Sequence, residues 1–468
     1  MTPLELYRRF STGLHYNAML YVMYKIVATG ITLILYNRFD CKTFSLYGNI
    51  NSIIFLILLW LDFGLQKTVP RFCIDYTTDK KSLHAFMQRL LQFKIALLIA
   101  AIPIYTWLFN NLMTNLEIFN TNNLLYIGIL LLLTEGVTSI IRLMYHAYFL
   151  HRTFNTLNAY TIAIELIISI ISILTIKKNN IGIVMMLLSS KIIANTILII
   201  LAWKSSSIIY TQINSNNEIS SPKEIVDRSF IKHAAIMYFN NSAKSLSERN
   251  FLFPLFTVTF GISTANMFKV ALDGALLFYR MVVKTIGTTD TALFAHLLHI
   301  NKKNETWQIA FKKLCTKIAA LVIPLIAIIY LLYQYELFNN YDPIVFQLFL
   351  IIIISLLIEI ILSPYERILE VNKNYRLLAC AYTPYLLIMG MLLLTNIMTS
   401  IGILDTILII HGVRLVSALI MVCITRIYYQ LHYPIYSLLY ITGLTWAGTI
   451  LIMYSIDNII PLLLPLLA

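Results

Sequence analysis

Long apolar runs alternate with short polar segments along almost the whole chain. A membrane-spanning helix needs about 20 consecutive apolar residues, and thirteen segments of the 468-residue sequence meet this requirement. These segments are 14–36, 44–66, 86–109, 123–149, 157–176, 181–203, 229–248, 264–294, 307–332, 343–365, 375–396, 402–425 and 434–455. The apolar tail 458–468 is too short to cross unaided and contains Pro461 and Pro465, so we interpret it as a partial fourteenth or interfacial segment. The pattern predicts an all-α integral membrane protein.

The composition supports this class and excludes others. Hydrophobic residues make up 59% of the chain and charged residues 12%, which is about half of the charged share of a soluble protein. A soluble domain cannot cover so much apolar side chain with polar surface, so a soluble enzyme and a disordered chain are excluded. The net charge of +13 records topology in a membrane protein, and we expect no nucleic-acid partner. The five cysteines show no paired spacing, so we expect neither a disulfide framework nor a metal site.

The basic residues between the predicted spans and in their end turns fall mostly on one side of the membrane. With the N-terminus in the cytoplasm, 21 of the 35 Lys and Arg residues lie on the inner side and 5 on the outer side. The five outer residues are Arg38, Lys42, Lys177, Lys178 and Arg249. This excess follows the positive-inside rule, so we expect a multi-pass protein of the cytoplasmic (inner) membrane with a cytoplasmic N-terminus.

The longest polar stretch, Lys204–Arg228, separates six predicted spans from the next six. Lys80 follows the second span as Lys302 follows the eighth. Pro103 lies in the third span as Pro324 lies in the ninth. These matches favour a 6+6 repeat related by a pseudo-two-fold axis along the membrane normal, and the alternative is coincidence, because such lysines and prolines are common. The expected parts are an N-terminal six-helix lobe (1–210), a cytoplasmic linker (211–228), a C-terminal six-helix lobe (229–433) and about one additional C-terminal span (434–468).

Nine basic residues lie deep inside the predicted spans, away from their inner ends, where an ionisable group costs on the order of 2.5–3.5 kcal/mol. They are Lys25, Lys94, Arg142, Lys191, Lys244, Lys269, Arg280, Lys284 and Arg414. In the eighth span, Lys269, Asp273, Arg280 and Lys284 share one face of the helix. This stripe predicts a hydrated path or a deep cavity. The alternative is an i,i+4 ion pair between Lys269 and Asp273, with the other two bases reaching toward the membrane surface.

Further charged residues are candidates for the same polar interior. Lys25 lies in the first predicted span, Asp62 toward the end of the second, and Lys244 in the seventh. Asp62 has an alternative role as the partner of a nearby base such as Lys67. Glu165, in the fifth span, has no base close to it in sequence and is the candidate for an ion relay. Its alternative role is a polar contact between helices.

The sequence contains no motif of enzymatic chemistry. HExxH, GxSxG, Walker and EF-hand patterns are all missing. A membrane-embedded glycosyltransferase or polymerase would also need a sizeable acidic outer loop, and no outer loop exceeds roughly 15 residues on this map. We therefore expect a protein that is not an enzyme and that has no cofactor.

The stretch YNRFDCKTFSLYGNINSIIFLILLWLDFGLQKTVPRF resembles the first hairpin of polysaccharide-transport flippases. An outer turn and a D-x-G-L step at the end of the second span carry the resemblance. The residues are Phe44, Tyr47 and Gly48 in the turn and Asp62, Gly64 and Leu65 in the step. The segments ERNFLFPLFTVTFGISTANMFKVALDG and YERILEVNKNYRLL are also similar, although the turn TFGISTANMF departs from the pattern. Over most of residues 10–430 the chain is similar to O-antigen and repeat-unit flippases of the multidrug/oligosaccharidyl-lipid/polysaccharide (MOP) exporter superfamily.

The resemblance implies two six-helix lobes that form a V around a central cavity lined mainly by the first, second, seventh and eighth helices. It also implies a substrate, a polyprenyl-diphosphate-linked oligosaccharide that moves from the inner to the outer leaflet by alternating access. The expected substrate-binding residues are Lys25, Asp62, Lys244, Lys269, Asp273, Arg280 and Lys284. Membrane lipids and polysaccharide-assembly proteins are the expected partners, and coupling to a gradient of H⁺ or Na⁺ is expected.

Two alternatives stay open within the same superfamily. A cation-coupled multidrug antiporter would have acidic rather than basic side chains as the dominant charges of the cavity. A lipid II flippase usually has fourteen full spans, and this chain lacks a clear fourteenth.

Overall fold

The computed structural model of the chain is helical over most of the residues that it describes, and no strand occurs among them. The described residues are 29–66, 68–69, 80–118, 121–147, 151–176, 180–213, 228–246, 248–277, 343–371, 375–395 and 397–429. Within them, seven helices are long and apolar enough to cross a membrane. The prediction of an all-α, multi-pass membrane protein is therefore confirmed. The predicted spans 307–332 and 434–455 and the tail 458–468 lie outside the described residues.

Most helices overlap a predicted span, and all of these except Tyr375–Leu394 extend beyond it at one end or both. They are α2 (Cys41–Trp60), α4 (Lys80–Leu116), α5 (Asn122–Ala147), α6 (His151–Thr175), α7 (Asn180–Ile213), α12 (Pro343–Val371), α13 (Tyr375–Leu394) and α14 (Ile397–Tyr429). The extensions are polar end turns. The backbone hydrogen bonds of a helix continue past the apolar core of a span, so hydropathy alone underestimates helix length.

The predicted end of the seventh span was wrong. α8 (Arg228–Ser245) is followed after a short break by α9 (Arg249–Phe260), which occupies the segment expected to be an outer loop. The sequence of α9, RNFLFPLFTVTF, is apolar, and the polar residues of the break made the span look complete. After α9, Gly261 with φ +84° turns the chain directly into the next helix, 262–277.

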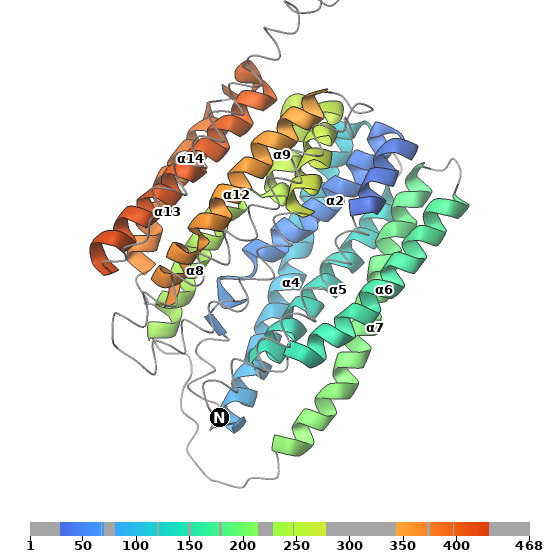
Figure 1. Ribbon diagram of the computed structural model, residues 1–468. Helices are drawn as coiled ribbons and strands as arrows, with labels where there is room; N and C mark the ends of the chain where they lie inside the picture. The colour runs from blue at the N-terminus through green and yellow to red at the C-terminus, as the bar shows by residue number, and fades with distance from the viewer. Residues whose placement is uncertain are drawn as a thin grey trace, which may run out of the picture. The chain divides into compact units, whose positions relative to one another are not determined.

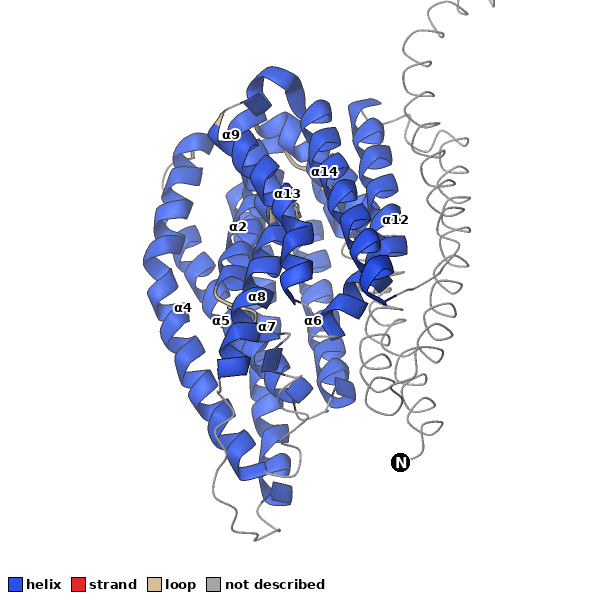
Figure 2. Ribbon diagram, turned by 90° about the vertical axis from the view of Figure 1, so that its left-hand side faces the viewer, coloured by secondary structure: helices blue, strands red, loops and turns tan. Residues whose placement is uncertain are grey.

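Contacts group the described residues of Met23–Asn266 into one compact unit and those from Met267 onward into a second. In the first unit α2 is central, because it packs against α4, α5, α7, α8 and α9, whereas α6 packs against α5 and α7 (Figures 1 and 2). In the candidate membrane span of α2, 72% of the residues are buried, against 22% in the candidate span of α6. The division into six-helix lobes 1–210 and 229–433 stays a prediction.

The sequence of α2 suits this central position. Asp40 caps its first turn, where the carboxylate accepts the Thr43 N–H at 3.2 Å. Small or polar side chains then follow at buried positions, among them Ser45, Gly48 and Ser52. Small residues let helices approach closely in a membrane protein, where the hydrophobic effect does not drive helix association.

In the second unit, α14 packs against both α12 and α13. A buried hydrogen bond of 2.7 Å between Ser355 Oγ and His411 Nδ1 joins α12 to α14. His411 thus has a structural partner in the described part of the chain. The helix α14 contains a kink at Gly402, where φ is +81°.

A break at residues 61–64 ends α2, and glycine is required there. Phe63 and Gly64 both have positive φ, +50° and +71°, and helical residues resume at 65. A Cβ atom on Gly64 would lie 2.7 Å from the Tyr238 backbone nitrogen and would also collide with the Ala234 carbonyl oxygen. The absence of a side chain therefore allows the break to lie directly on the backbone of α8.

We predict that Gly64→Ala destabilises the protein by at least about 2 kcal/mol, because it adds a backbone collision to an unfavourable φ. The measurement is the midpoint of thermal unfolding of the purified protein in detergent. Gly412→Ala in α14 is the matched control, since no atom lies within 4 Å of its added Cβ, and the better helix propensity of alanine should leave its midpoint equal or higher. Equal midpoints for the two variants would contradict this account of the break.

Candidate functional site

The second span forms a polar seam with the segment 228–266 along its whole length. Polar contacts join the second span to this segment at three levels. From one level to the next the residue numbers rise along the second span and fall along the segment, so the two run antiparallel. The contacts are Asn266 Nδ2 to the Cys41 carbonyl oxygen (2.8 Å), Asn49 Nδ2 to Thr257 Oγ1 (3.0 Å) and Thr68 Oγ1 to His233 Nδ1 (3.0 Å). Side-chain hydrogen bonds between helices are a favoured means of association inside a membrane.

Asn49 is the centre of the middle level. Its amide nitrogen lies 3.0 Å from the carbonyl oxygen and 3.0 Å from the hydroxyl oxygen of Ser45, as well as from Thr257. The Thr257 hydroxyl in turn donates to the Phe253 carbonyl oxygen at 2.8 Å. All these groups are buried, so the hydrogen bonds replace water that the seam excludes.

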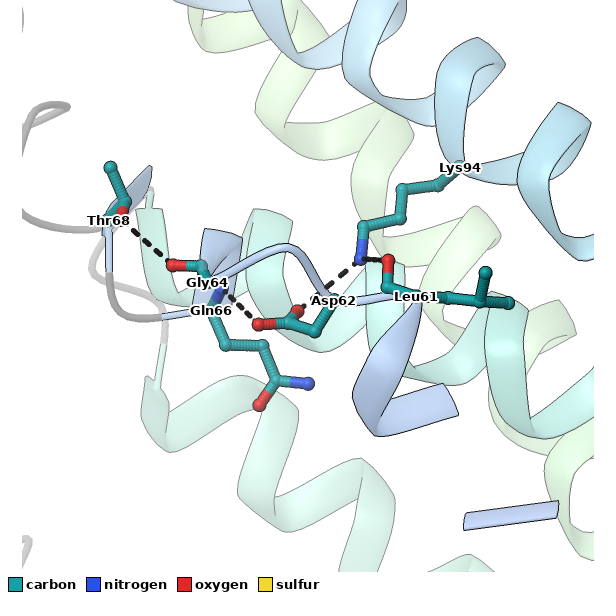
Figure 3. A network of polar contacts seen from close by, with 6 residues as sticks. All are labelled: Leu61, Asp62, Gly64, Gln66, Thr68 and Lys94. Atoms are coloured by element: carbon teal, nitrogen blue, oxygen red, sulfur yellow. Dashed lines mark hydrogen bonds and ion pairs between the residues drawn. The ribbon is translucent and has the colours of Figure 1, made fainter. Parts of the chain in front are cut away.

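A buried ion pair marks the break at the end of α2 (Figure 3). The Lys94 ammonium of α4 donates to the Leu61 carbonyl oxygen at 2.7 Å and lies 3.4 Å from Asp62 Oδ1. The other carboxylate oxygen of Asp62 accepts the Gln66 N–H at 3.2 Å. The lysine and aspartate side chains are only 8% and 6% exposed.

Helix electrostatics account for this arrangement. The carbonyl end of a helix carries a partial negative charge, and the Lys94 ammonium meets it at Leu61, where α2 ends. The amide end of a helix favours an anion, and the Asp62 carboxylate binds the Gln66 N–H where helical residues resume. The broken helix therefore provides a partner for each member of the ion pair, which reduces the cost of burying two charges.

The same break packs against α8 through aromatic and polar side chains. Phe63 stacks on Tyr238 with 5.3 Å between ring centroids. Thr68 Oγ1 lies 2.8 Å from the Gly64 carbonyl oxygen. When its single hydrogen is donated to that carbonyl, the hydroxyl accepts a hydrogen bond from His233 Nδ1. His233 is thus part of the packing between α8 and the end of the second span.

α8 also carries a buried amide that no other described residue satisfies. Asn240 is 1% exposed, and neither its Oδ1 nor its Nδ2 has a hydrogen-bond partner within the described part of the chain. Lys244 follows one turn later in the same helix. A buried amide of this kind is satisfied by a water molecule or by a polar ligand, so this turn of α8 is suited to polar binding.

The described part of the charged stripe in the second unit contains an ion pair. Lys269 Nζ lies 3.2 Å from Asp273 Oδ2, and the two side chains are 4% and 9% exposed. This contact is the i,i+4 ion pair that we weighed as the alternative to a hydrated stripe. Arg280 and Lys284, the other members of the stripe, lie outside the described residues.

The remaining candidates are placed as follows. Lys25 lies outside the described residues, and so does Lys67, the alternative partner of Asp62. Lys244 belongs to α8, but its side chain is not described. Glu165 is partly buried in α6, and its role as an ion relay stays a prediction. Among the described residues, no three His, Cys, Asp or Glu side chains come close enough to hold a metal ion.

Sequence reasoning missed two lysines that contact α2 or the break at its end. Lys94 was counted among the buried bases but was not assigned to Asp62, and Lys191 of α7 was not assigned to Asn51, whose Oδ1 lies 2.5 Å from its ammonium. The available signal was the number of basic residues inside apolar spans, because each such base requires a partner or water. Partners on neighbouring helices cannot, however, be identified from spacing along one helix.

We predict that Lys94→Met destabilises the protein by about 3–5 kcal/mol, because it leaves the buried Asp62 carboxylate without its cation. Adding Asp62→Asn to this variant should recover a large part of the loss, since a neutral amide is less costly to bury than a carboxylate. Thermal unfolding of the purified single and double variants measures both effects.

The matched control is the exposed ion pair between Lys42 and Glu117, whose atoms are 3.8 Å apart. Lys42→Met should change the stability by less than about 1 kcal/mol, because surface ion pairs contribute little. A Lys94→Met protein as stable as the Lys42→Met protein would show that the pair at the break does not hold the helices in place.

The comparisons with known proteins identify a fold. No protein-family model and no curated protein sequence matches the chain. Solved structures do match it. A MOP-superfamily transporter from Pyrococcus furiosus, described as having a binding pocket of reverse polarity that suggests a different function, has a TM-score of 0.59 and 13% identity over 90% of this chain and 95% of its own.

Two further structures agree with the first. The eukaryotic MATE transporter AtDTX14 has a TM-score of 0.61 and 12% identity over 89% of this chain and 95% of its own. An inward-facing multidrug resistance MATE transporter of the MOP superfamily has a TM-score of 0.60 and 12% identity over 90% of this chain and 98% of its own. Identities this low show the fold alone. The chain therefore has the fold of MATE transporters of the MOP superfamily.

Proposed function

We propose that this protein is a transporter that flips a polyprenyl-diphosphate-linked oligosaccharide from the inner to the outer leaflet of the cytoplasmic membrane. The observation that carries the proposal is the state of the buried acids. Both buried aspartates of the described residues, Asp62 and Asp273, are bound by a lysine. A carboxylate that is already paired does not attract a cationic substrate, whereas an interior rich in bases suits a diphosphate.

In this proposal the bases that the sequence places inside the predicted spans hold the diphosphate. Arg280 and Lys284 continue the stripe beyond the Lys269–Asp273 pair, and Lys25 and Lys244 are contributed by the first and seventh spans. The unsatisfied Asn240 amide, one turn from Lys244, supports polar binding at that level of α8. Sugar hydroxyls would need such groups, while the polyprenyl chain stays in the lipid.

The pocket polarity of the Pyrococcus furiosus transporter supports the idea that one fold serves different substrates. Its reverse polarity is described as suggesting a different function. Fold does not determine substrate, so the charges of the site must do so. In this chain those charges favour an anionic or zwitterionic head group.

Membrane lipids and polysaccharide-assembly proteins are the partners in this proposal, and nucleic acid has no role. A H⁺ or Na⁺ gradient drives the transport step.

A cation-coupled multidrug antiporter is the second candidate. It is favoured by a specific observation, the similarity of the fold to multidrug MATE transporters. In that case Glu165 would be a candidate for the coupling site, because it lies partly buried within an apolar helix. The two candidates differ in the sign of the substrate charge, and an experiment can separate them on that basis.

We predict that the chain complements a strain that lacks its oligosaccharide flippase, and that the double variant Arg280→Ala, Lys284→Ala lowers surface polysaccharide at least tenfold. Losing one partner of a charge-assisted contact costs about 2–5 kcal/mol in a desolvated site. Arg280→Lys should fall between the parent and Arg280→Ala, because lysine keeps the charge but loses the bidentate geometry.

Two controls make this experiment decisive. Lys42→Ala, at an exposed position, should complement fully, and the amounts of all variants in the membrane should be equal by immunoblot. Full complementation by the double variant would exclude these bases as the diphosphate site. A chain that fails to complement but protects cells against cationic drugs would instead establish the antiporter.

A further inference from the structure

The ammonium of Lys191 lies in a cage on one face of α2. Its nitrogen is 2.5 Å from Asn51 Oδ1, 5.5 Å from the centroid of the Tyr47 ring and 5.9 Å from the centroid of the Phe55 ring. The three cage residues stand at i, i+4 and i+8, so they follow one another along a single face of the helix. Lys191 reaches this face from α7, which packs against α2.

The cage is oriented for a positive charge before the lysine enters it. The Asn51 amide nitrogen donates to the Tyr47 carbonyl oxygen at 2.7 Å, which fixes Oδ1 toward the Lys191 ammonium. Asn51 is 4% exposed, so its amide has little freedom to turn over. The faces of aromatic rings carry partial negative charge. All three groups therefore present electron density to the same point.

This arrangement selects one chemical class of ligand. An ammonium group gains attraction from two ring faces and a hydrogen bond to the amide oxygen. An anion would be repelled by all three groups, and a neutral ligand would gain only the hydrogen bond. The site lies about 15 Å along α2 from its start at Cys41, since each helical residue rises 1.5 Å.

We propose that Tyr47, Asn51 and Phe55 form a binding site for ammonium cations, and that the chain fills this site with its own Lys191 and so excludes organic cations from this face of α2. Lys191 is then a specificity-determining residue, because its own ammonium group competes with free organic cations for the site. The proposal goes beyond the transport of a lipid-linked oligosaccharide and does not depend on it, because it concerns which ligands are kept out.

The test uses methylammonium, which has the end group of a lysine side chain. Lys191→Ala removes the tethered ammonium and leaves the cage residues in place. Methylammonium chloride should raise the thermal unfolding midpoint of the purified full-length variant in a saturable way. The midpoint of the parent should rise only at methylammonium concentrations at least about tenfold higher, or not at all, because the Lys191 ammonium already lies over both rings. Sodium chloride at equal ionic strength is the reference.

Three variants serve as controls. Lys191→Met should show no response, because a neutral side chain of similar length keeps the cage filled. Lys204→Ala, at an exposed position of the same helix, should behave like the parent. Adding Asn51→Leu to Lys191→Ala should abolish the response, because it removes the oxygen that faces the cation.

If Lys191→Ala cannot be purified, Lys191→Ser replaces it, since the short hydroxyl keeps a polar neighbour for Asn51 and still empties the cage. Saturable stabilisation of either variant, lost on Asn51→Leu, supports the proposal. A folded Lys191→Ala protein that ignores methylammonium would overturn it, and so would a parent that responds as strongly as the variant. Because the measured quantity is the unfolding midpoint of the purified protein, neither result depends on oligosaccharide transport.

Discussion

The Lys94 ammonium at the end of α2 shows the constraint on which the rest of this molecule depends. Inside a membrane there is no bulk water, so each polar or charged group must find its partner within the protein. Lys94 meets the Leu61 carbonyl oxygen and the Asp62 carboxylate, and Lys269 meets Asp273. Ion pairs and hydrogen bonds of this kind join α2 and the break at its end to α4, α7 and α9.

α2 illustrates how far this constraint shapes the first unit. It carries buried polar side chains at Ser45, Asn49 and Asn51 and is covered by five other helices. A helix so polar is unsuited to contact with lipid, and its central position follows from that. The polar seam with α9 satisfies Asn49 through Thr257, and α7 brings Lys191 to Asn51. Both the second and the seventh span are interrupted, which is common where helices of transporters bind their substrates.

The sequence was sufficient to predict the class of the fold, because repeated runs of about twenty apolar residues are typical of membrane-spanning helices. It also predicted that Asp62 lies near the end of its span, and it offered the Lys269–Asp273 ion pair as the alternative to a hydrated stripe. It failed at α9, where the polar break before Arg249 concealed the continuation of the span. It also failed to pair Asp62 with Lys94, because the partner lies 32 positions away on a neighbouring helix. Periodicity assigns residues to faces of one helix, but only packing decides which faces meet.

In the function that we propose, the paired aspartates and the additional bases suit this MATE-like fold to an anionic lipid-linked substrate. The most direct test is translocation by the purified protein in liposomes that contain a polyprenyl-diphosphate oligosaccharide in one leaflet and a fluorescent organic cation inside. With an imposed H⁺ or Na⁺ gradient, we expect the sugar to become accessible to a lectin in the opposite leaflet while the cation stays in place. Movement of the cation without movement of the sugar would contradict this proposal.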